Sequence, residues 1–193
     1  MLVSARTIGS LGLLLGVAAC SDEGLDPDAY HWEMHLVGAV DTCHDEFQTF
    51  RDSSMIYSVS YASSDATLAL NRNTFARGTI AGCSLNYESP VFKQEAPGGD
   101  EENYVQWLLE GTADQQQGGA GCGIEAEAYE ILADYFPDAE SWDQLGIEWA
   151  PDELDWIGLE TFRVVGVGDS VADLQVGCSY TVLTTGKYFL LEE

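Results

Sequence analysis

The sequence predicts an all-β domain, built as an antiparallel meander that either closes as a barrel or folds as a sandwich. Apolar and polar residues alternate through much of the chain, which is the period of half-buried strands. Roughly eight such runs are separated by Gly, Asn and Pro, as expected for short antiparallel strands. Residues 30–193 show no fixed repeat and no second domain, so we predict a single domain there.

The first strand is predicted to begin at Tyr30. Over residues 30–36, aromatic and apolar side chains alternate with His31, Glu33 and His35, so one face is expected in the core and the other in solvent. Turns are predicted at residues 71–73 and at Thr185-Gly186. Further strands are predicted at residues 57–61, 67–70, 74–80, 81–87, 104–109, 156–167, 174–183 and 188–191.

One helix is predicted over residues 125–136, where Tyr129, Leu132 and Phe136 recur at helical spacing and Pro137 ends the run. Residues 138–155 then form a long acidic loop. Tryptophans within and just after this loop are expected to cap the open end of the β core, or else to stack on a sugar ring or a protein partner. These are Trp142, Trp149 and Trp156.

The N-terminus has the pattern of an exported protein. Arg6 precedes an apolar run over residues 8–19, which is too short to span a bilayer as a helix. The run ends in Val17-Ala18-Ala19-Cys20, which resembles the lipobox of bacterial lipoprotein precursors. The resemblance implies a signal peptide at 1–19 and a diacylglycerol-modified, further acylated Cys20 on a tether at 20–29. An ordinary secretory signal that is cut after Ala19 is the alternative.

The resemblance also implies a location. Ser21 follows the cysteine, where Asp would favour retention in the inner membrane, so delivery to the bacterial outer membrane is expected. The lipid-anchored domain would then face either the periplasm or the cell surface.

The remaining cysteines predict two disulfides. Cys43, Cys83, Cys122 and Cys178 are an even number in a chain expected to reach an oxidising compartment. Their spacings do not match a structural zinc site. Three pairings are open, and proximity in sequence favours Cys43 with Cys83 and Cys122 with Cys178.

The charge of the chain limits its partners. The 33 Asp and Glu residues against 7 Lys and Arg give a formal net charge of −26. Such a surface repels phosphate backbones and excludes nucleic acid as a partner. A protein, a glycan or a cation remains as a partner, besides the membrane reached through the N-terminal lipid.

Candidate metal ligands fall in two groups. His31, Glu33 and His35 lie in a row on one face of the first predicted strand and could bind zinc or copper if His44 folds back beside them. The alternative is that this row is simply the solvated face of the strand. In the acidic loop, oxygen ligands for calcium are available in two clusters. The clusters are Asp138, Glu140 and Asp143, and Asp152, Glu153 and Asp155.

No catalytic residue is assigned. Gly168-Asp169-Ser170 resembles the nucleophile block of SGNH esterases, but no histidine follows Ser170 to act as its base. The sequence therefore favours an anchored, non-catalytic binding or structural module of the cell envelope that needs no cofactor. A lipocalin-like carrier of a small apolar ligand is an alternative if the strands enclose a cavity, and interior aromatics that fill the barrel would exclude it. A metal- or carboxylate-dependent hydrolase is the third hypothesis.

The lipobox hypothesis predicts that Cys20→Ala produces an unprocessed precursor that no longer partitions into the detergent phase, because the acyl chains supply the membrane affinity. Detergent phase separation of labelled cells measures this. Partitioning that survives the substitution would show that the lipobox interpretation is wrong.

Overall fold

The computed structural model describes residues 25–26, 28–44, 51–71, 74–95, 103–117, 121–169 and 174–191, and for residues 51–54 the backbone only. The lipobox with Cys20, and Ser170 of the Gly-Asp-Ser segment, lie outside the described residues.

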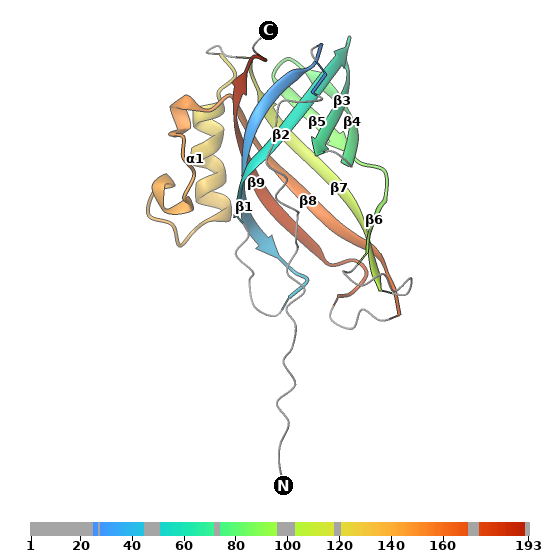
Figure 1. The fold of residues 1–193 in the computed structure, drawn as a ribbon. Coiled ribbons are helices and arrows are strands. Elements are labelled where there is room, and N and C mark those ends of the chain that lie inside the picture. Colours follow the sequence, from blue (N-terminus) through green and yellow to red (C-terminus); the bar gives the residue numbers. More distant parts are fainter. Residues whose placement is uncertain are drawn as a thin grey trace.

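The predicted all-β fold is confirmed, and it is a closed barrel (Figure 1). In the described segments, eight antiparallel strands follow one another around the barrel, which closes where β5 pairs with β7, while the first strand pairs with the last. A short ninth strand, β6, pairs with the first four residues of β7. The strands are β1 (Tyr30–Asp41), β2 (Arg51–Ala62), β3 (Asp65–Asn71), β4 (Thr74–Ala81), β5 (Ser84–Glu88), β6 (Phe92–Glu95), β7 (Tyr104–Gln115), β8 (Trp156–Val167) and β9 (Ser179–Phe189).

Alternation along the strands separates the interior of the barrel from its outer face. Trp32, Met34 and Leu36 of β1 point inward and are almost fully buried, as the sequence predicts. Their partners on β9 include Gly186, opposite Met34. The interior cluster draws a side chain or more from each of the eight barrel strands, so the barrel is held together by one common core.

Several predicted strand boundaries are wrong: the strand predicted at 174–183 begins only at Ser179, and the one predicted at 104–109 continues to Gln115. Two further errors involve a glycine. The run 81–87 is not one strand, because β4 ends at Ala81 and Gly82 turns the chain with a φ of 65°. Thr185-Gly186, in contrast, is no turn, because β9 continues through it to Phe189. Gly186 is required for packing, since a Cβ there would overlap the Met34 sulfur and crowd Trp156.

The predicted helix is confirmed as α1 (Ile124–Tyr135), which lies against the outside of the barrel (Figure 1). Its buried residues Ile124, Ala128 and Ile131 belong to a second apolar cluster with Ile157 and Leu183 of the outer barrel face. The 3-10 turns η1 (Trp142–Leu145) and η2 (Pro151–Glu153) follow within the acidic segment. Trp142 and Leu145 of η1, and Leu154 just after η2, belong to the same cluster.

The tryptophans do not cap an open end of the core. Trp142 and Trp149 lie in the outer cluster, where the Trp142 indole donates a hydrogen bond to the Trp149 carbonyl at 3.0 Å. Trp156 is fully buried inside the barrel. The acidic segment thus folds back onto the barrel wall, because its tryptophans and leucines have an apolar outer face to cover there.

Two disulfides are present, as predicted, but the pairing favoured by proximity is wrong. Cys43 is bonded to Cys178, and Cys83 is bonded to Cys122. Strand register explains the first bond, because β1 ends just before Cys43 and β9 begins just after Cys178, and these two strands pair along their length. The second bond ties the β4–β5 turn to the segment before α1. The two bonds therefore secure opposite ends of the barrel.

The loop lengths predict unequal contributions to stability. The loop-entropy relation gives about 5 kcal/mol for the 135-residue separation of Cys43 and Cys178 and about 4 kcal/mol for the 39-residue separation of Cys83 and Cys122. Urea unfolding should therefore show that Cys43→Ala/Cys178→Ala lowers the free energy of unfolding more than Cys83→Ala/Cys122→Ala does. The reverse order would contradict the prediction that Cys43–Cys178, which closes the longer loop, contributes more to the free energy of unfolding.

Candidate functional site

The predicted histidine row exists, but it is not solvated. His31, Glu33 and His35 share the outer face of β1, yet only Glu33 is exposed, and the histidines are 2 % and 5 % exposed. His31 is held by Ser58 Oγ at 2.8 Å from Nδ1 and by the Asp26 carbonyl at 3.0 Å from Nε2. Because a carbonyl only accepts, Nε2 carries a proton that it donates to Asp26, and in the neutral ring Nδ1 then accepts from the Ser58 hydroxyl. Both ring nitrogens are thus engaged within the protein.

His44 does not fold back beside this row. It lies past the opposite end of β1, where its Nδ1 is 2.7 Å from the Asp41 carboxylate. The acidic candidates also serve local structure, since Glu153 accepts from the Ala150 amide and Asp155 from the Tyr188 amide. Among the residues that the structure describes, no three His, Cys, Asp or Glu side chains gather closely enough to hold a metal ion.

A buried carboxyl group inside the barrel was missed by the sequence analysis. Glu160 of β8 is completely buried, and both carboxylate oxygens accept hydrogen bonds from tyrosines. The Tyr87 hydroxyl donates to Oε1 at 2.6 Å, and the Tyr57 hydroxyl donates to Oε2 at 3.0 Å. The sequence does contain a signal for its burial. Glu160 lies four residues after Trp156 and two before Phe162 on β8, and this even spacing places it on the same inward face.

Glycine at one position lets this cluster form. In the sheet, Tyr87 on β5 lies opposite Gly111 on β7, which lies opposite Glu160 on β8. A Cβ on residue 111 would overlap the Tyr87 ring. Because residue 111 has no side chain, the Tyr87 ring crosses above it and reaches the carboxylate two strands away.

Burial raises the pKa of Glu160 to about 7, although the hydrogen bonds from Tyr87 and Tyr57 oppose this rise. Burial, together with the nearby Glu160, also raises the pKa of Tyr87 well above its ordinary value. In the described part of the chain, no Lys, Arg or His forms an ion pair with Glu160. The carboxyl group is therefore neutral or charged according to pH rather than fixed by a cation.

Aromatic rings fill the interior around Glu160. The Trp156 ring centroid is 5.4 Å from that of Trp32, 5.9 Å from that of Tyr57 and 6.3 Å from that of Tyr87. The Trp156 indole donates to Thr184 Oγ1 at 3.1 Å, so its polar atom is satisfied as well. A pKa near 7 would suit a general acid, but a substrate cannot reach a carboxyl group packed among these rings. We interpret Glu160 as part of the core.

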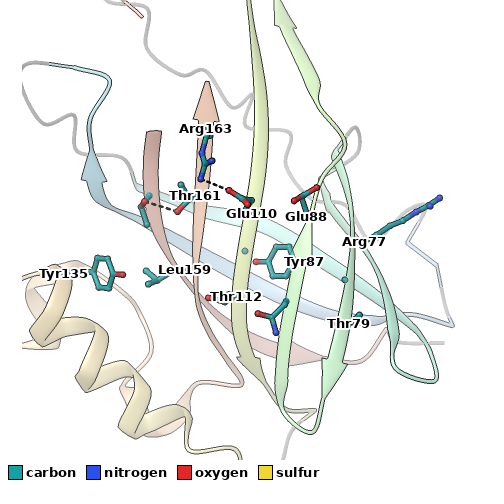
Figure 2. A pocket seen from close by; sticks show the side chains of 14 residues that line it. Arg77, Thr79, Tyr87, Glu88, Glu110, Thr112, Tyr135, Leu159, Thr161 and Arg163 are labelled. Atoms are coloured by element: carbon teal, nitrogen blue, oxygen red, sulfur yellow. Dashed lines mark hydrogen bonds and ion pairs between the residues drawn. The ribbon is translucent and has the colours of Figure 1, made fainter. Parts of the chain in front are cut away.

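The hollow that the described residues form near this cluster is on the outside of the barrel. It is an open groove of about 780 Å³ across the outer faces of β4, β5, β7, β8 and β9, with Tyr135 of α1 at one wall (Figure 2). We call it the outer groove. Strand register arranges its side chains in two rows, to which Arg163 is added. One row is Arg77, Glu88, Glu110, Thr161 and Thr181, and the other is Thr79, Asn86, Thr112 and Leu159.

Comparison of the chain with protein-family models, with curated proteins and with solved structures finds no match. Within the described residues, no helix has the length and hydropathy that crossing a bilayer requires. The site must therefore be interpreted from its own chemistry.

The raised pKa of Glu160 predicts a specific pH dependence of stability. Between pH 4.5 and about 7 the folded protein keeps a proton that the unfolded chain loses, so Glu160 makes the free energy of unfolding fall as pH rises, by roughly 3 kcal/mol. Glu160→Gln should remove this component. Urea unfolding across pH 4–8 should show the variant gaining stability relative to the wild type up to pH 7. A difference that is constant with pH would contradict the assignment, and the exposed Glu88→Gln is the control.

Proposed function

We propose that this protein is a lipid-anchored module of the bacterial outer membrane that binds its ligand on the outer face of the barrel and catalyses no reaction. One observation carries the proposal. The interior around Glu160 is filled by Trp32, Trp156 and the two tyrosines, whereas the outer groove is open and lined by polar side chains. A rigid barrel that presents a groove is suited to binding.

The anchor rests on the N-terminal residues. Val17-Ala18-Ala19-Cys20 resembles a lipobox, and the two disulfides are of the kind that persist in an oxidising, extracytoplasmic compartment. A lipid on Cys20 would hold the domain at the membrane and leave the barrel wall free to meet a ligand.

The closed barrel of eight strands is also compatible with a lipocalin-like carrier, which would hold its ligand inside. Packing favours the outer face instead. A Cβ on Gly111 would collide with the Tyr87 ring, and a Cβ on Gly186 would collide with the Met34 sulfur. These interior side chains fill the space above the two glycines and leave little room there for a ligand.

A hydrolase would need its reactive groups in one accessible place. Among the described residues, His31 and His44 lie beyond hydrogen-bond reach of each other at opposite ends of β1, and Glu160 is enclosed by rings. The metal-dependent version of this hypothesis gains no cluster of ligands among these residues. For the carboxylate-dependent version, Glu88 and Glu110 are register partners in the outer groove, but Arg163 already holds Glu110 in an ion pair.

Photo-crosslinking separates the two binding hypotheses. The full-length lipidated protein in detergent micelles is irradiated with a photoreactive fatty acid, with and without an excess of unlabelled fatty acid, and the modified residues are mapped by mass spectrometry. We expect no competable label on Trp32, Tyr57 or Trp156, because packed rings exclude the probe. Competable labelling of these interior residues would establish a carrier and overturn our proposal.

A further inference from the structure

We propose that the outer groove binds an uncharged oligosaccharide. This inference rests on the proposed function and names its ligand class. Three properties of the groove suit such a ligand: its local charge balance, the hydrogen-bonding groups on its floor, and an aromatic side chain at its wall.

The groove is locally neutral in a strongly acidic protein. Two of the seven Lys and Arg residues in the whole chain line it, and two glutamates oppose them. Arg163 Nη2 is 2.9 Å from Glu110 Oε2 (Figure 2). Arg77 is the register partner of Glu88 in the β4–β5 pair, although its side chain points away from Glu88. Two arginines and two glutamates give the lining a formal charge of zero, so the groove attracts a charged ligand of neither sign, and the net charge of −26 repels anions further.

A ligand in the groove would meet side chains, because the backbone hydrogen-bonding groups of the floor are already used in strand pairing. Each of the central strands β4, β5, β7 and β8 is paired on both sides, so an extended peptide cannot add to the sheet here. The uncharged floor residues are Thr79, Asn86, Thr112, Thr161 and Thr181. Hydroxyl and amide groups both donate and accept hydrogen bonds, which matches the hydroxyl groups of a sugar.

Tyr135 supplies the aromatic wall. It is the last residue of α1, which the outer apolar cluster and the Cys83–Cys122 bond hold against the barrel. In Figure 2 its ring lies beside Leu159 at the edge of the groove. A half-buried tyrosine gives a rigid amphipathic surface at little entropic cost, and the C–H face of a pyranose ring packs well on such a surface.

The test uses the full-length lipidated protein in micelles of a non-glycosidic detergent. Isothermal titration calorimetry and saturation-transfer NMR measure the binding of three neutral trisaccharides, chitotriose, cellotriose and maltotriose. An anionic trimer, trigalacturonate, and a cationic trimer of glucosamine are measured alongside them. Tyr135→Ala removes the wall and Thr112→Trp fills the floor. The matched controls are Tyr129→Ala, which changes an exposed tyrosine of the same helix, and Thr67→Trp, which changes an exposed threonine of β3.

We expect at least one neutral trisaccharide to bind, with affinity at least about tenfold lower in Tyr135→Ala and Thr112→Trp and unchanged in both controls. Three results would overturn the inference. They are no binding of any neutral trisaccharide up to about 10 mM, binding that survives Thr112→Trp, and preferential binding of a charged trimer. The fatty-acid crosslinking reports separately on the proposed function, because failure of the sugars with an unlabelled interior rejects only the ligand class.

Discussion

The carboxyl group of Glu160 joins strands that are not neighbours in the barrel wall. It accepts hydrogen bonds from Tyr57 on β2 and from Tyr87 on β5, while it belongs to β8. These bonds cross the interior and span the β5–β7 seam at which the barrel closes. A buried carboxyl group without a cation is costly, and its two phenol donors offset part of that cost. The hydrogen-bonded cluster of Glu160, Tyr57 and Tyr87 therefore stabilises the closure of the barrel.

The division between interior and exterior follows from this core. The Tyr87 ring crosses above Gly111, and Met34 and Trp156 pack against Gly186, so the interior around Glu160 is occupied by side chains. Ligand binding is therefore expected on the outer face of the barrel, which solvent can reach. There, α1 and the acidic segment cover one part of the outer face with apolar side chains, and the polar outer groove begins at Tyr135, where the helix ends. The disulfides fix both ends of this scaffold.

Local patterns predicted the local structure well. Alternation over residues 30–36 identified the inward face of β1, and helical spacing located α1 within one residue at each end. Long-range pairing was not readable in the same way. The choice of barrel over sandwich depends on the pairing of β5 with β7, and the choice of Cys43–Cys178 over nearer partners depends on the pairing of β1 with β9. His31 is buried where its ring meets the Asp26 carbonyl, Ser58 and the Phe189 ring, contacts from other segments that no property of the strand itself reveals.

The central claim is that the barrel interior around Glu160 is a packed core and that the outer face is the accessible one. Hydroxyl-radical footprinting of the full-length protein, read residue by residue with mass spectrometry, measures this most directly. We expect Trp32 and Trp156 to stay unmodified while Tyr129 and the half-buried Trp149 are oxidised. Oxidation of Trp32 and Trp156 at the rate of Trp149 would show a solvent-filled interior and contradict this claim.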